Sequence, residues 1–136
     1  MRPIEFKAQN VNGVWVCGNF SILKKKIGNV DAGIYISNSA GAPFAYKVRP
    51  ETVSQFTGLT DKNGKKIFEG DIIEIIEIDA FGNLDWNRLK GKVMFSEGAW
   101  LVTDNRSFAI PLWSEINEIE VIGNIHENPE LLEVAT

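Results

Sequence analysis

The sequence predicts a mainly β protein whose short strands build a small barrel or roll. Segments rich in β-branched and aromatic residues recur along the chain, and several of them alternate apolar with polar positions. Residues 52–78, TVSQFTGLTDKNGKKIFEGDIIEIIEI, alternate turn signals and strand signals without a break. Several short strands at this spacing favour a barrel or roll over a helix-rich domain.

The first third of the chain predicts a smaller, mostly antiparallel β unit. Short strands are expected over residues 4–8, 14–22, 33–37 and 44–48. Asn12 and Gly13 between the first two are a hairpin signal. The basic run from Lys24 to Lys26 precedes Gly28, and a solvated strand end is favoured there over an anion site.

A division of the chain is expected near Pro50, which interrupts the strand pattern. Residues 1–51 are expected to form the N-terminal unit, and residues 52–136 the C-terminal barrel with a short helical turn after Pro129. The alternative is that both parts share one compact unit. At 136 residues, the chain fits either organisation.

The central segment predicts two turns and one buried strand. Asp61 can cap its own turn and Gly64 is free to adopt a positive φ, so a tight reversal is expected there. Residues 69–71, Glu-Gly-Asp, predict a second bend. The isoleucine-rich segment 72–78 has apolar residues on both faces of the expected strand, which predicts burial on both sides.

The remainder of the chain predicts a polar and aromatic loop followed by further strands. The loop is expected over residues 80–89, and the strands over 92–95, 99–103 and 120–125. In the strand 99–103, Trp100 and Val102 share one face.

Composition limits the classes of function. The net charge of −4 gives no overall electrostatic footprint for nucleic acid. A single cysteine, Cys17, excludes an intramolecular disulfide and suits a reducing compartment. No apolar run approaches the roughly 18 residues of a membrane helix, and the N-terminus does not resemble a signal peptide. We therefore expect a cytoplasmic protein with no membrane partner.

Candidate catalytic groups are sparse. His126 is the only histidine, so a Cys/His dyad would require Cys17 beside it, and a lone cysteine is more often a small buried hydrophobe. Glu74, Glu77 and Asp79 could bind a metal only with further oxygen ligands, and a role in solubilising a strand edge is favoured. No glycine-rich segment has phosphate-loop spacing. We predict no catalytic residue, metal or cofactor.

Trp86, Arg88 and Lys90 form the one local combination of aromatic and basic residues, with Lys92 nearby. Such residues can stack a base and hold a phosphate, but a loop that covers a barrel end would look the same, and this covering role is favoured. A binding module could also present Trp86, Trp100 and Trp113 to a peptide, a protein or single-stranded nucleic acid. Joint exposure of Trp86 and Trp113 would support such a surface.

Three segments, RPIEFKA, TVSQFTGLTDKNGKKIFEGDIIEI and IEVIGNIHENPELLE, resemble the YopX family of phage and prophage proteins. The resemblance implies an SH3-type β-barrel or roll in the C-terminal part, a smaller β-rich N-terminal part, and a place in a bacterial host cell. Gly70 and Asp71 then correspond to the start of a barrel strand, and Gly123 to a sharp bend or close backbone approach. The family has no established activity, so no catalytic residue is implied.

The function predicted from these observations is that of a non-enzymatic protein-binding accessory protein of a phage or prophage. The residues assigned to binding are Trp86, Arg88, Lys90, Trp100 and Trp113. Two alternatives are single-stranded nucleic-acid binding through Trp86, Arg88 and Lys90, which the acidic charge disfavours, and a carboxylate-based metal-dependent enzyme. Self-association through strand edges is a separate prediction.

Overall fold

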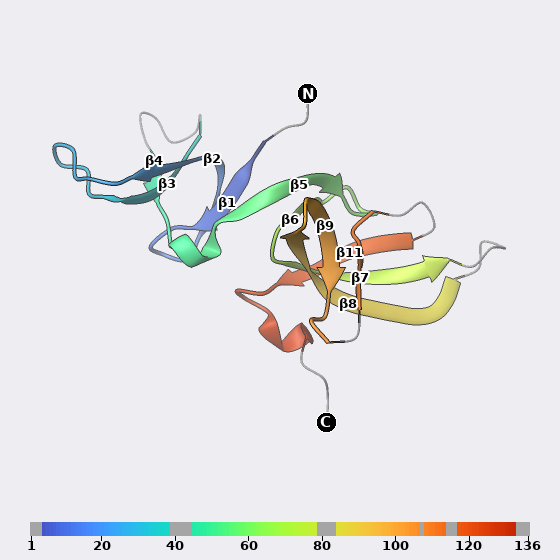
Figure 1. The fold of residues 1–136 in the computed structure, drawn as a ribbon. Helices are drawn as coiled ribbons and strands as arrows, with labels where there is room; N and C mark the ends of the chain where they lie inside the picture. Colours follow the sequence, from blue (N-terminus) through green and yellow to red (C-terminus); the bar gives the residue numbers. More distant parts are fainter. Residues whose placement is uncertain (1–3, 39–44, 79–83, 107, 114–116, 133–136) are drawn as a thin grey trace. The chain divides into compact units, whose positions relative to one another are not determined.

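Antiparallel strands make up most of the computed structural model, which describes residues 4–38, 45–78, 84–106, 108–113 and 117–132 (Figure 1). The strands are β1 (Phe6–Gln9), β2 (Trp15–Leu23), β3 (Gly33–Ser37), β4 (Ala45–Lys47), β5 (Ser54–Thr60), β6 (Lys66–Phe68), β7 (Asp71–Ile78), β8 (Leu84–Ser96), β9 (Ala99–Thr103), β10 (Ala109–Pro111) and β11 (Asn117–Asn124). They form sheets in the orders β4-β3-β2-β1-β5-β6 and β10-β9-β8-β7-β11. The prediction of a mainly β fold is confirmed.

The chain divides into two compact units, Met1–Phe56 and Thr57–Thr136. The sequence pattern placed this division between residues 51 and 52. The structural boundary lies within β5, because its first residues pair with β1 whereas the residues from Thr57 belong to the second unit. Residues 50–52 form a 3₁₀ turn, with proline in its first position.

The first unit contains the predicted hairpin between β1 and β2. The Asn10 side chain closes the turn, because its Oδ1 accepts the backbone N–H groups of Asn12 and Val14 at 2.9 and 3.0 Å. Gly13 has a φ of 80°. Behind the hairpin, a small core contains Ala8, Ile36 and Val48, all buried.

Strand β2 changes partner at Gly18. Residues up to Gly18 pair with β1, and residues 19–23 pair with β3. A Cβ atom at Gly18 would overlap the carbonyl oxygen of Ser37, so only glycine permits this crossing without a shift of the backbone. Beyond it, residues 19–37 form a hairpin, which we call the β2–β3 arm (Figure 1).

The second unit is built around β7, which lies between β8 and β11. Ile73 and Ile75 belong to the main core with Val93 and Val102, and these four side chains are fully or almost fully buried. Ile72 on the opposite side of β7 is also fully buried. The predicted burial of this strand on both faces is confirmed.

Two predictions for the second unit are corrected. A closed SH3-type barrel is not found among the described residues, because the five-stranded sheet ends at β10 and β11 and stays open. The expected loop at residues 80–89 is wrong for residues 84–89, which form the first part of β8. Pairing with β7, from Ile75 opposite Leu89 to Ile78 opposite Leu84, overrides the polar local composition. Residues 80–83 lie outside the described structure.

Two predicted glycine positions have the expected surroundings. Gly70 lies in the bend before β7 with a φ of 84°, and the buried Asp71 side chain accepts the N–H of Phe68 at 2.8 Å. The ladder between β11 and β7 shifts register at Gly123. A Cβ there would lie 2.6 Å from Oδ1 of Asn128, which confirms the close approach. The predicted C-terminal helical turn is the 3₁₀ turn Pro129–Leu132.

Asp61 joins the β5–β6 turn to the edge strand β11. Its Oδ1 accepts the N–H groups of Asn63 and Lys65, both at 2.9 Å, and its Oδ2 accepts that of Val121 at 3.0 Å. The next residue, Lys62, donates its N–H to the carbonyl of Ile119. Asp61 is only 6% exposed, so this buried carboxylate has backbone donors on both oxygens.

The pKa of Asp61 lies below its ordinary value of 3.8. Burial raises the pKa, but the N–H groups of Val121, Lys65 and Asn63, together with the charge of Lys65, outweigh burial by stabilising the ionised form. The predicted self-capping of this turn is confirmed, and the contact with β11 extends it.

We expect Asp61→Asn to lower the free energy of unfolding by about 2 to 3 kcal/mol, because an amide cannot accept on both sides and leaves one buried N–H without its partner. Urea denaturation at about pH 7 measures this change. Asp31→Asn is the matched control, since this exposed carboxylate should change stability by less than about 0.5 kcal/mol. Equal effects of the two substitutions would contradict the assigned role.

We also expect the stability difference between the wild type and Asp61→Asn to depend on pH. Because folding lowers the pKa of Asp61, its stabilisation is complete above the unfolded-state value of 3.8 and is lost as the pH falls through the lower folded-state value. Urea titrations in a pH series should show a constant difference down to about pH 5 and a shrinking one below about pH 4. A difference that already shrinks near neutral pH would mean a raised pKa instead.

Candidate functional site

Trp100 and Phe95 form an aromatic contact where β8 and β9 meet their connecting turn. The two residues are direct cross-strand partners, and their rings meet edge to face with centroids 5.0 Å apart. Trp100 packs on the main core, whereas Phe95 is 53% exposed. The core thus fixes Trp100, and Trp100 supports the exposed ring of Phe95.

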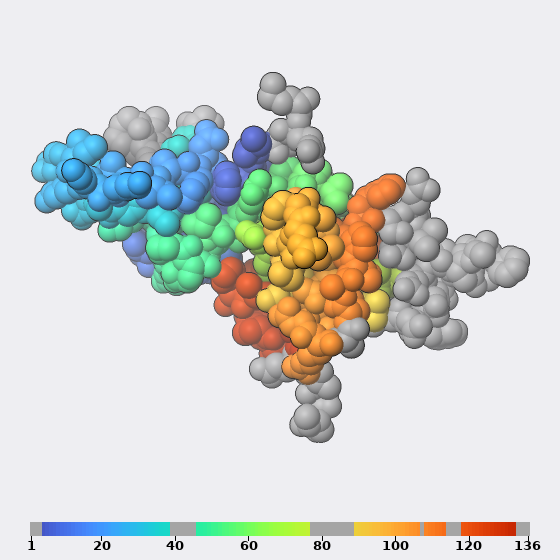
Figure 2. Space-filling model, in the orientation of Figure 1, coloured from blue at the N-terminus to red at the C-terminus, as the bar shows by residue number. Residues whose placement is uncertain are grey.

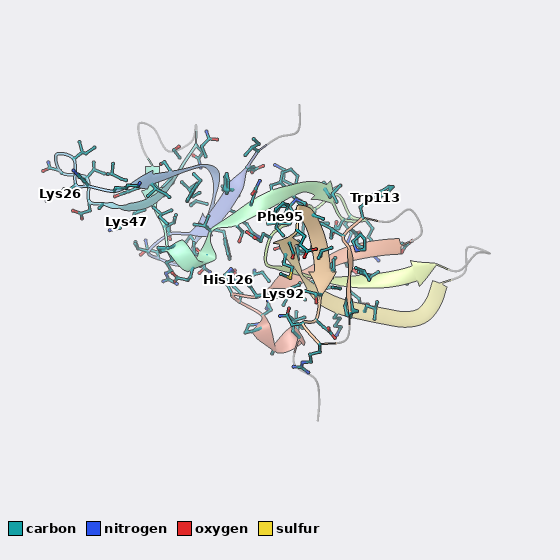
Figure 3. All side chains as sticks on the ribbon, in the orientation of Figure 1. Lys26, Lys47, Lys92, Phe95, Trp113 and His126 are labelled. Carbon is teal, nitrogen blue, oxygen red and sulfur yellow. The ribbon has the colours of Figure 1, made fainter. Side chains whose placement is uncertain are left out.

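Trp113 lies at the same end of the sheet. The preceding residue, Leu112, is buried in the main core and donates its N–H to the carbonyl of Trp100 at 3.1 Å. Trp113 itself is 59% exposed (Figure 3). We call Phe95, Trp100 and Trp113 the aromatic end. Two of the predicted binding residues therefore lie here, and Phe95 is an addition that the strand pattern alone did not distinguish from core.

Trp86, Arg88 and Lys90 lie in β8, not in a loop as expected. The side chains of Trp86 and Arg88 are outside the described structure, so the joint exposure of Trp86 and Trp113 is answered only for Trp113. Lys90 is exposed and lies opposite Glu74 of β7. Opposite charges at such positions stabilise a sheet, which favours a structural role for Lys90.

Acidic and basic residues continue in a row across this sheet. Glu120 of β11 is the partner of Glu74 on its other side, and Lys62 pairs with Glu120 at 3.6 Å. Within the described residues, no group of three or more His, Cys, Asp or Glu side chains could hold a metal ion.

Cys17 is exposed, so the expectation of a small buried hydrophobe is wrong. It lies in β2 of the first unit, where its carbonyl accepts the side-chain amide of Asn38 at 2.8 Å. His126 follows β11 in the second unit. In the described part of the chain, no helix has the length and apolar character that a membrane crossing requires.

The β2–β3 arm carries exposed apolar residues that the sequence analysis did not single out. Ile22, Ile27 and Val30 are 58%, 64% and 50% exposed. The lysines from 24 to 26 lie among them and are exposed, in agreement with a solvated strand end. The available signal was the occurrence of apolar residues on both sides of the lysine run, in a segment too short to have a core of its own.

A model of the YopX protein family matches residues 7–133. The chain belongs to the YopX family. Its fold is similar to the crystal structure of protein EF1440 from Enterococcus faecalis, with 26% sequence identity, a TM-score of 0.52, and coverage of 98% of this chain and 100% of that chain. No curated protein matches the sequence. The predicted resemblance to YopX proteins is confirmed over nearly the whole chain.

In this YopX-family chain, charge is segregated between the two units. The first unit has seven Lys and Arg against three Asp and Glu, a net charge of +4, and the second has seven against fifteen, a net charge of −8. The two values sum to the overall −4. The acidic total therefore conceals a basic N-terminal unit.

We expect Trp113→Phe to remove more of the acrylamide-quenchable tryptophan fluorescence than Trp100→Phe does. The reason is that Trp113 is exposed, whereas Trp100 packs on the core and is covered in part by Phe95. Stern–Volmer plots of the two variants and the wild type give the comparison. A larger loss in Trp100→Phe would show that the aromatic end is arranged differently in solution.

Proposed function

We propose that this chain is a non-enzymatic module that binds another protein through the aromatic end. The observation that carries the proposal is the exposure of two aromatic side chains, Phe95 and Trp113, each by more than half, at one end of one sheet. Aromatic side chains at the centre of protein interfaces contribute a large share of the binding energy. Their exposure in an isolated chain is therefore best explained by a partner that covers them.

The support beneath the aromatic end favours specific binding. Val93 and Val102 are buried cross-strand partners, and Phe95 and Trp100 continue the same pair of strands by two residues. Because Trp100 is fixed on the core, little side-chain entropy is lost when a partner covers Phe95. We propose further that the second unit acts in the manner of an SH3-type roll, with binding residues at the strand ends.

The proposed setting is the cytoplasm of a bacterial host, where the chain would serve as an accessory protein of a phage or prophage. This setting rests on membership of the YopX family and on the sequence resemblance to phage and prophage proteins. The proposal assigns no catalytic step.

Two other ligands compete with a protein partner. Trp86, Arg88 and Lys90 occupy alternate positions of β8, an arrangement compatible with single-stranded nucleic acid, but the second unit has a net charge of −8. A metal-dependent enzyme would need converging carboxylates. Glu74 and Glu120 are neighbours, but Lys90 and Lys62 flank them on either side.

We expect the double variant Phe95→Ala, Trp113→Ala to lose a host protein that the wild type retains in a pull-down from bacterial lysate, identified by mass spectrometry. Circular dichroism must show that the variant is folded. The matched control is Val11→Ala, Val14→Ala, which removes exposed apolar side chains from the β1–β2 turn of the first unit. The control should retain the partner.

Retention of the same protein by the folded aromatic variant would contradict the proposal. Fluorescence polarisation with a labelled single-stranded oligonucleotide tests the competing ligand. Binding that is lost in Lys90→Gln but kept in the aromatic variant would favour nucleic acid in place of protein.

A further inference from the structure

The β2–β3 arm is a second exposed surface, and it does not depend on the aromatic end. Residues 19–23 of β2 pair with β3, whereas β1 pairs only with residues 15–18 of β2. Within the described structure, the outer edge of the arm therefore has no strand beside it. In Figure 2 the arm, in shades of blue, forms one end of the first unit.

The tip of the arm combines apolar and cationic side chains. Ile22, Ile27 and Val30 are each exposed by half or more, and three consecutive exposed lysines, 24 to 26, lie between Ile22 and Ile27 (Figure 3). One weak ion pair is present, between Lys26 and Asp31 at 4.0 Å, with both side chains about two-thirds exposed. A surface of this composition suits a partner that is acidic and partly apolar.

The second unit of another copy of the chain meets that description. It has a net charge of −8, against +4 for the unit that carries the arm, and it exposes the large side chains of Phe95 and Trp113. Opposite charges on two surfaces accelerate encounter and select the partner. When both surfaces belong to one chain, they favour an arrangement in which copies join head to tail.

We propose that the β2–β3 arm of one copy docks on the acidic second unit of another copy. The contact is heterologous, so each copy offers one arm and one acceptor surface, and assembly proceeds to rings or open chains. Lysine side chains supply the charge, while Ile22, Ile27 and Val30 become covered.

Nucleic acid explains the arm less well. Phosphate binding uses the lysines but gives no role to three exposed aliphatic side chains, which cannot stack on bases as aromatic rings do. A purely protective role for the lysines, as guards against pairing at an exposed strand edge, is the other reading. This reading predicts the opposite response to their removal.

The test is sedimentation velocity of the full chain over a range of concentrations, in NaCl from about 0.1 M to about 1 M, where the Debye length falls from about 10 Å to about 3 Å. We expect a weight-average mass that rises above 15.2 kDa at low salt and returns to it at high salt. Lys24→Gln, Lys25→Gln, Lys26→Gln should weaken association at least about tenfold. The control Lys66→Gln, Lys90→Gln, Arg106→Gln removes the same charge from exposed sites of the second unit and should associate like the wild type.

A mixing experiment distinguishes this contact from one between two arms. Lys24→Glu, Lys25→Glu, Lys26→Glu should be monomeric alone but still bind labelled wild type one to one, because its acceptor surface is intact. Failure of this variant to bind wild type would overturn the proposal. So would a monomeric wild type at low salt, stronger association after removal of the lysines, or binding of a labelled oligonucleotide by the arm without self-association.

Discussion

The buried carboxylate of Asp61 is the interaction on which the second unit depends. It accepts backbone N–H groups from its own turn and from Val121 of β11, two segments sixty residues apart in sequence. A carboxylate in this position is stable only when its oxygens have donors, so the turn and the strand edge must form together. The same contact explains why the sheet stays open. The turn, in place of another strand, lies against the outer side of β11.

Local signals in the sequence were sufficient for the turns and for the central strand. Asp61 with Gly64, Asn12 with Gly13, and the isoleucines of β7 specify their structures through backbone geometry and burial, which neighbouring residues determine. The extent of β8 was not accessible in this way, because pairing with β7 draws a polar segment into the sheet. The reach of Asp61 to Val121 was equally hidden, since it depends on tertiary packing.

The candidate surfaces show the same division between local and tertiary information. Trp100 and Trp113 could be named from residue type, but the sequence could not show that one packs on the core and the other is exposed. Phe95 and the apolar residues of the β2–β3 arm were missed because an aliphatic or aromatic residue in a strand is normally assigned to the core. The charge separation was present in the sequence and became meaningful only once the boundary at Phe56 was known.

These features describe a scaffold that holds exposed groups in fixed positions, and its cohesion around Asp61 is the central claim. Native-state amide hydrogen exchange, followed by NMR, tests that claim most directly. We expect the amides of Asn63, Lys65 and Val121 to exchange with one common opening free energy, equal to that of the buried amides of β7. Rapid exchange of Asn63 and Lys65 while Val121 stays protected would show that the turn opens independently, and would contradict the role assigned to Asp61.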